Sequence, residues 1–247
     1  RIRAMQKVLD YGRSISYDNL GDLVNETWGY STLKPQEDTA WEFMVDQVKE
    51  YPGQVTIMAI GACTNVALAI HNDPTFAENT AGIYYMGGAI DVPGNDTPAA
   101  ERNWYYDPES VEICLEAAFP VQVVVPHDIS FRQVLTKEIV ESMISAGDTP
   151  YTQLVREFAY PRFEQDPERR QRLWDAQVPG IFLCPDLIAE TDVREIAIVT
   201  DMGYTYGESV AWAEGRGPAS ATTCTVVYDV HGEDYWNFVA ELFGTEF

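Results

Sequence analysis

The sequence has few cysteines and few histidines. Its 247 residues include four cysteines and three histidines. Cys63, Cys114, Cys184 and Cys224 are widely spaced and form no Cys-x-x-Cys pair, which argues against a zinc site or thioredoxin-type chemistry. Each lies in an apolar stretch, so buried free thiols are the favoured interpretation, although a sequence alone does not reveal disulfide pairing.

Positive charge is scarce as well. There are 16 basic against 39 acidic residues, and the formal net charge is −23. Such a charge repels nucleic acids and anionic membrane surfaces, and a solubilising acidic surface is its simplest interpretation. No apolar run approaches the roughly 18 residues that a membrane span needs. We therefore expect no nucleic-acid partner and no membrane partner, while the sequence leaves the compartment open.

Common catalytic motifs are also absent. The chain has no G-x-G-x-x-G, no Walker loop, no G-x-S-x-G and no H-E-x-x-H, and its histidines share no metal-ligand spacing. His71 ends an apolar helical pattern, where a C-terminal capping role is expected, and His231 lies in a turn where solvation is expected. His127 follows an apolar run beside Asp128 and is the histidine that we consider for a site.

What the sequence does have is a regular alternation of helical and strand patterns. Helices are predicted over residues 3–12, 39–53, 63–74, 107–120, 136–147 and 232–243, and strands over 54–61, 82–88 and 121–126. Pro52–Gly53 ends the second helix, and Thr64 or Asn65 is the expected cap of the third. Residues 156–187 are predicted to be helical with a polar interruption, and residues 195–230 to form strands and turns.

This alternation indicates βαβ units. It predicts an α/β fold with a mostly parallel, Rossmann-like open sheet and helices on both faces. No repeat or low-complexity linker divides the chain, so we expect a single domain over residues 1–247. Because ligands of such sheets bind at the carboxyl ends of the strands, the loops after Ile60, Met86 and Val125 are the candidate site loops.

The loop from residue 86 to 103 is the most polar of the three. The side chains that could bind a ligand are in this loop and in one later stretch: Asn95, Asp96, Glu101, Asn103 and Asp175. Amides and carboxylates placed together can bind several hydroxyl groups, as in a sugar, and glycines 87, 88 and 94 would let the backbone approach that ligand. Alternatively, Asn95 and Asp96 only build turns and Glu101 caps the next helix. The residues themselves leave both interpretations open.

Three stretches carry a more specific pattern. They are "VTIMAIGACTNVALAIHNDP" (55–74), "GIYYMGGAIDVPGNDTPAAERNWYYDPESVEIC" (82–114) and "LWDAQVPGIFLCPDL" (173–187). Their combination of GxxTN, MGG…GN…AExN and a late aspartate resembles the inosine-uridine-type nucleoside hydrolase family, from about residue 40 onward. The resemblance implies hydrolysis of ribonucleosides to ribose and free base by a calcium-activated water.

The resemblance also implies roles for single residues. Asn95 and Glu101 would hold the 5′-hydroxyl, Asn103 the other ribose hydroxyls, and Met86 would pack beneath the sugar. Calcium ligands would include the Asp175 carboxylate and the backbone carbonyl of Ile60. A homo-oligomer is expected on the same ground.

One part of the family pattern is not found. An N-terminal strand ending in DxDxxxDD supplies two calcium-binding carboxylates and the general-base aspartate in the family, and Asp10, Asp18 and Asp22 lack that spacing. We therefore expect the N-terminal strands of the sheet to be missing, with the domain incomplete. Either a longer chain or a partner segment completes the sheet, or the protein is a non-catalytic sugar-binding or assembly protein without calcium. We favour the first, since an open apolar sheet edge invites aggregation.

Trp174 is a second departure. It stands where members of the family have the histidine that protonates the leaving base, and an indole cannot donate that proton at neutral pH. It could stack on the substrate, or it could simply pack in the core. We count Trp174 among the substrate-binding residues. Either Tyr204 or Tyr206 is then the leaving-group acid, or the base is one that leaves readily without protonation. Arg102 stands where the family often has an aromatic residue.

Overall fold

The structure is a computed structural model, and it describes residues 29–246. The helix predicted over residues 3–12 and the three aspartates Asp10, Asp18 and Asp22 lie outside the described residues. The elements are, in chain order, α3 (Ala40–Glu50), β1 (Thr56–Ala59), α4 (Thr64–Asn72), β2 (Gly82–Met86), α5 (Arg102–Tyr106), α6 (Pro108–Glu116), β3 (Gln122–Val125), the 3₁₀ turn η1 (His127–Phe131), β4 (Val134–Leu135), α7 (Lys137–Ser145), α8 (Pro150–Leu154), the π-helical turn η2 (Val155–Ala159), α9 (Tyr160–Gln165), β5 (Gln171–Arg172), α10 (Gln177–Leu183), η3 (Pro185–Leu187), β6 (Ile188–Ile198), β7 (Ser209–Ala213), β8 (Thr222–Val230) and α11 (Gly232–Gly244).

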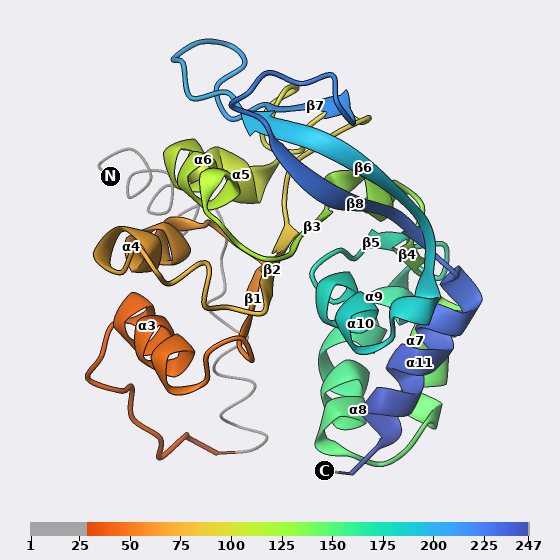
Figure 1. Cartoon of the computed structure of the whole chain (residues 1–247). Helices are drawn as coiled ribbons and strands as arrows, with labels where there is room; N and C mark the ends of the chain where they lie inside the picture. The colour runs from red at the N-terminus through yellow and green to blue at the C-terminus, as the bar shows by residue number, and fades with distance from the viewer. Residues whose placement is uncertain (1–28, 247) are drawn as a thin grey trace.

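The main sheet is mostly parallel. Its strand order is β1-β2-β3-β8-β6-β7, with β1, β2, β3 and β8 parallel and β6 antiparallel to both of its neighbours (Figure 1). The short strands β4 and β5 form a separate antiparallel pair. These pairings confirm the predicted fold class, whereas the assignment of residues 1–247 to one domain stays a prediction.

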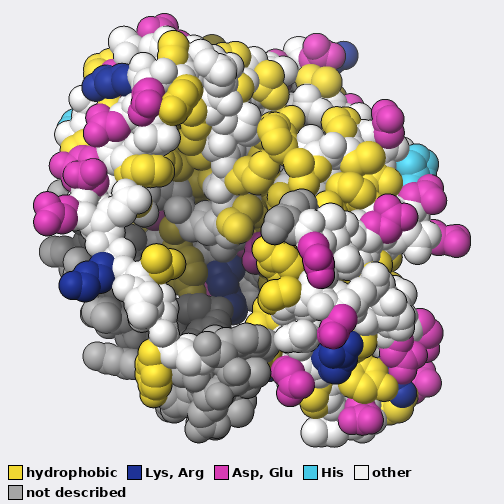
Figure 2. Space-filling model, turned by 90° about the horizontal axis from the view of Figure 1, so that it is seen from below, with side chains coloured by type: hydrophobic (Ala, Val, Ile, Leu, Met, Phe, Trp, Pro, Cys, Tyr) yellow, Lys and Arg dark blue, Asp and Glu magenta, His cyan; other side chains and the backbone are white. Residues whose placement is uncertain are grey.

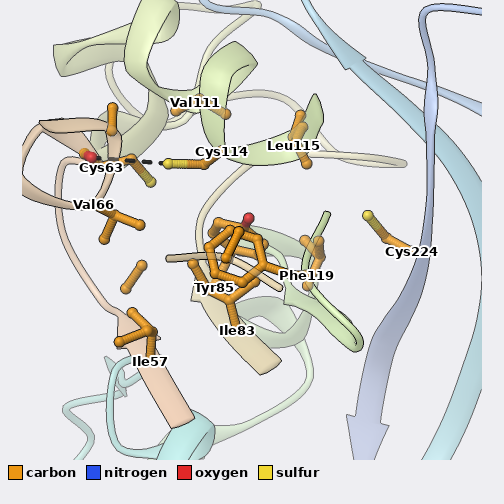
Figure 3. Close-up of a cluster of buried hydrophobic side chains, with 14 of the residues drawn as sticks. Ile57, Cys63, Val66, Ile83, Tyr85, Val111, Cys114, Leu115, Phe119 and Cys224 are labelled. Carbon is orange, nitrogen blue, oxygen red and sulfur yellow. Dashed lines mark hydrogen bonds between the residues drawn. The ribbon is translucent and has the colours of Figure 1, made fainter. Parts of the chain in front are cut away.

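Helices cover both faces of the sheet, as predicted. In β3 the fully buried Val124 packs into a core with α3, α4 and α6, while Val123 and Val125 pack into a second core with α7, α9, α10 and α11. Figure 3 shows part of the first core, in which Ile57 and Ile83 come from adjacent strands. Strands buried on both sides explain the continuous apolar run in β3.

The cysteines are free thiols, and three of the four are buried: Cys63, Cys114 and Cys224 (Figure 3). Cys184 is half-buried just after α10, so the prediction of burial is wrong for this residue. The end of a helix at the surface leaves its thiol only partly covered.

The cap predicted for α4 is also wrong. Cys63 is the N-cap residue and makes no side-chain cap hydrogen bond, while Thr64 is the first helical residue. The Thr64 hydroxyl instead donates to Oδ2 of Asp107 at 2.5 Å, which ties α4 to the start of α6. Helix α3 does have a capping box, formed by Thr39 and Glu42.

The surface is consistent with the acidic composition. In Figure 2 acidic side chains are spread around the rim of the visible face, basic ones are few, and hydrophobic ones gather toward its middle. In residues 29–246 no helix has the length and apolar character required for a membrane crossing.

Candidate functional site

Asn103 joins the ends of two parallel strands. Its side-chain Nδ2 donates to the carbonyl of Met86, at the end of β2, at 3.0 Å, and lies 3.4 Å from the carbonyl of Ile60, just after β1. Carbonyl oxygens only accept, so these contacts fix which end of the amide is the NH₂ group. No described residue donates to Oδ1 of Asn103, which leaves this oxygen to accept from a ligand hydroxyl.

Glu101 lies buried beside Asn103. Its carboxylate accepts N–H bonds from Gly88 at 3.1 Å, Asn103 at 2.9 Å and Trp104 at 3.2 Å, and the residue is 2% exposed. It is the N-cap of α5, so the capping interpretation of Glu101 is correct. Burial raises its pKa to about 7 despite the three N–H bonds, and the charge of Asp175 adds to the rise. Oε2 accepts two of these N–H groups and Oε1 only one, so Oε1 keeps a lone pair and capping does not exclude a ligand.

The Asn95 and Asp96 side chains brace the loop around Arg102. Oδ1 of Asn95 accepts from the backbone N–H of Arg102 at 2.8 Å, and Oδ1 of Asp96 lies 3.4 Å from Nε of Arg102. These contacts favour the turn-building interpretation for both residues. The Nδ2 group of Asn95 makes no hydrogen bond to a described residue and stays available as a donor.

The glycines of the loop make room for the protein itself. A Cβ on Gly87 would lie 2.1 Å from the indole nitrogen of Trp104, and one on Gly94 would lie 2.2 Å from the carbonyl of Ala100. Gly88 has a positive φ of 79° and also lies against Trp104. Close packing within the loop therefore accounts for these glycines, and the approach of a ligand to their backbone stays a prediction.

Two anchors of this loop were missed from the sequence. The buried Asp128 carboxylate accepts the N–H groups of Ile90 and Asp91, at 2.9 and 2.7 Å, and the Ser209 hydroxyl bonds both the N–H and the carbonyl of Ala89. The only signal for Asp128 was its place directly after β3. Ser209 is 120 residues from its partner, so no local pattern could find it.

The other side of the site is aromatic. The half-buried Trp174 packs at right angles to His127, with 6.1 Å between ring centroids and an angle of 76°. The neighbouring Asp175 is exposed, and desolvation by its surroundings raises the pKa of its carboxyl. Asp175 lies close enough to Glu101 for its charge to raise the pKa of Glu101. The polar loop with Glu101 and the aromatic side with Trp174 are therefore neighbours.

Comparison with known proteins shows which family the chain belongs to. The model described as "Inosine-uridine preferring nucleoside hydrolase" matches residues 10–237. The chain belongs to this family. The resemblance carried by the three sequence stretches is thereby confirmed.

Named relatives of the nucleoside hydrolase family cover most of this chain. Probable uridine nucleosidase 1 of Oryza sativa subsp. japonica is 45% identical over 207 residues, which are 83% of this chain and 58% of the relative. The pyrimidine-specific ribonucleoside hydrolase RihA of Citrobacter koseri is 32% identical over 218 residues, 85% of this chain and 67% of the relative. The match to uridine nucleosidase 1 of Arabidopsis thaliana covers only 51% of the length of that protein. The chain thus spans little more than half of these plant relatives.

Solved nucleoside hydrolases share the fold. The plant enzyme PpNRh1 has a TM-score of 0.75 at 25% identity, with 87% of this chain and 70% of that chain covered. The inosine-uridine preferring enzyme of Bacillus anthracis has a TM-score of 0.71 at 21% identity, covering 88% and 70% of the two chains, and supports the fold alone.

The resemblance implied a calcium site, and the residues described here do not make one by themselves. Within residues 29–246 no three His, Cys, Asp or Glu side chains gather in a way that could hold a metal ion. The Asp175 carboxylate and the Ile60 carbonyl offer three oxygens at most, against the roughly six to eight that calcium takes. The Ile60 carbonyl also lies 3.4 Å from the Asn103 amide.

The two tyrosines considered as acids lie in different settings. The Tyr206 hydroxyl donates to the Glu109 carboxylate at 2.8 Å and is buried, whereas Tyr204 is fully exposed. The bond to Glu109 gives Tyr206 a structural role, because it holds the loop before β7 against α6.

Proposed function

We propose that the complete protein hydrolyses the N-glycosidic bond of ribonucleosides to ribose and free base. Membership of the nucleoside hydrolase family supports the reaction, and the observation that carries it here is the Asn103 amide. Its Nδ2 is held by the ends of β1 and β2 while its Oδ1 is left open beside the buried Glu101. The relatives named uridine nucleosidase make uridine the first substrate to test.

The ribose would lie across the carboxyl ends of β1 and β2. Oδ1 of Asn103 accepts from the secondary hydroxyls, while Nδ2 of Asn95 and the carboxylate of Glu101 hold the 5′-hydroxyl. Met86 is fully buried, so its side chain has little surface for contact with the sugar. It supports the sugar from below through Asn103, whose amide donates to the Met86 carbonyl. Trp174 faces the base from the other side, where an aromatic ring suits any nucleobase.

The residue types suit the transition state of this reaction. As the bond from C1′ to the base breaks, the ribose gains oxocarbenium character, and negative charge near a tightly held sugar stabilises it more than the ground state. Asp175 supplies that charge, and Glu101 adds to it when it is ionised, above its raised pKa of about 7. We assign no described residue as the general base, the group that takes the proton of the attacking water.

Calcium is the cofactor that we propose for the complete protein only. Asp175 and the Ile60 carbonyl would be two of its ligands, and other carboxylates from outside the described residues would be required. We also propose that the protein is a homo-oligomer, or that a partner segment completes the sheet. Strand β1 supports the second idea, because among the described residues it pairs only with β2.

The test is release of ribose from a panel of nucleosides by the complete protein, with calcium and with a chelator. We expect calcium-dependent release, with uridine among the substrates. Nucleoside binding without release from any member of the panel would contradict the proposal and would support the non-catalytic sugar-binding alternative.

A further inference from the structure

Four side chains form a row that ends at Trp174. The guanidinium of Arg172 lies 3.8 Å from the ring centre of Phe131, and Phe131 packs edge-on to His127 with 5.1 Å between centroids. His127 in turn packs edge-on to Trp174 at 6.1 Å. Pairing of β4 with β5 joins the two segments that supply the row. The indole of Trp174 is therefore supported from one side by a packed ring.

The His127 ring is fixed by a single hydroxyl. The Ser130 Oγ lies 2.7 Å from the His127 carbonyl and 2.9 Å from Nδ1 of the ring. A carbonyl only accepts, so the one hydroxyl proton points to it, and Nδ1–H must then donate to Oγ. With 2% exposure, the ring cannot turn without breaking this bond inside the protein. Nε2 carries the lone pair and receives no bond from a described residue.

We propose that His127 is a positioning residue for the base: its ring holds the Trp174 indole in the orientation against which the nucleobase stacks. This inference rests on the proposed hydrolysis of nucleosides. Trp174 is half-buried, and in the arrangement that we propose the nucleobase lies on the side of the indole away from His127. A stacking platform must keep one orientation to place C1′ of the ribose correctly, and ring-to-ring contact supplies that restraint.

Proton donation by His127 fits the structure less well than positioning. A donor would need a protonated Nε2, but burial and the charge of Arg172 lower the pKa of His127. The ring is therefore neutral near pH 7, with its lone pair at Nε2. Near pH 7 the contribution of His127 to the site is therefore the packing of its ring against Trp174.

Two substitutions separate the ring contact from the hydrogen bond. His127→Asn keeps an N–H group for Ser130 but removes the ring from Trp174, whereas His127→Phe keeps a ring and loses the N–H group. In the complete protein we expect H127N to raise KM for uridine about two- to tenfold with little change in kcat, and H127F to stay near the parent value. His231→Gln, at an exposed histidine, is the matched control and should change nothing.

A double-mutant cycle tests whether His127 acts through Trp174. In a W174A background, which has already lost the platform, H127N should cause no further rise in KM. A rise of the same size in both backgrounds would overturn the proposal, and so would an H127F variant as impaired as H127N.

The contact is also measured without catalysis. The emission of Trp174, taken as the difference between the protein and its W174F variant, should change in H127N and stay unchanged in H231Q. Unchanged emission in H127N would overturn the contact itself. If emission changes but the parent protein releases ribose from no nucleoside, the proposed function fails and the base-positioning role fails with it, while the contact stands.

Discussion

The two sides of the candidate site are built differently. On the side of residues 86–103, polar side chains are bonded to backbone groups: Glu101 to three N–H groups, and Asn103 to the Met86 carbonyl. On the side of Trp174, contacts run from ring to ring, through His127 to Phe131. The first side therefore ties ligand binding to folding, because the same residues would serve both, whereas the second orients the nucleobase with less effect on stability.

Asp175 is the residue where the two sides meet, and its replacement should have the largest effect. In the complete protein, D175A should weaken calcium binding and reduce ribose release about 100-fold or more, because a direct oxygen ligand is lost. Calcium affinity is measured by titration calorimetry, with Asp201→Ala, an exposed carboxylate of another loop, as control. Unchanged calcium affinity in D175A would show that the residue is not a ligand.

Removal of the Glu101 side chain tests the polar side. E101A leaves three N–H groups without their acceptor beneath a buried loop, so we expect the free energy of unfolding to fall by about 2 kcal/mol. Urea unfolding measures it. A matched substitution on the aromatic side, H127N, should cost less stability than E101A, and an equal loss would break the distinction between the two sides.

Protonation of Glu101 gives a smaller effect, with a defined sign. Its folded pKa of about 7 lies above the ordinary value for an unfolded glutamate, so the stability that it contributes by binding a proton is present at low pH and is lost as pH rises through about 7. The free energy of unfolding should therefore fall from pH 5 to pH 8 more in the parent protein than in E101Q. Parallel pH profiles of the two proteins would mean that Glu101 is not perturbed.

Arg172 should have the smallest effect. It stacks on the half-exposed Phe131 at the outer end of the aromatic row, where such a contact is worth about 0.5 kcal/mol. R172A should lower the free energy of unfolding by about this amount and leave kcat unchanged. A loss of activity as large as that of D175A would place Arg172 in the site and contradict its role as an outer support.

The sequence predicted the sheet because a sheet of this kind follows from local patterns, and the same patterns suggest the place of the site, which stays a prediction. Apolar runs such as Val123–Val125 mark buried parallel strands, and the carboxyl ends of such strands mark a site. Asn103, Met86 and Ile60 do meet at this edge, as their order in the sequence suggested.

The fine structure could not be predicted, since it depends on contacts between distant residues. The lack of a side chain at Gly87 and Gly94 makes room for Trp104 and Ala100, a packing requirement that the sequence did not reveal. Thr64 was expected to cap α4, but its hydroxyl finds Asp107, which is 43 residues away. The pairing of His127 with Trp174 likewise depends on the β4–β5 contact, which brings together segments with no shared pattern.

The central claim is that the Asn103 side of the site binds ribose through its hydroxyls. Its most direct test compares uridine with 2′,3′-dideoxyuridine as substrates of the complete protein and of its N103A variant. The account predicts that the parent protein prefers uridine about 100-fold or more, and that N103A narrows this preference about tenfold or more, because a site that bonds a hydroxyl rejects the analogue without it. The same preference in both proteins would contradict the account.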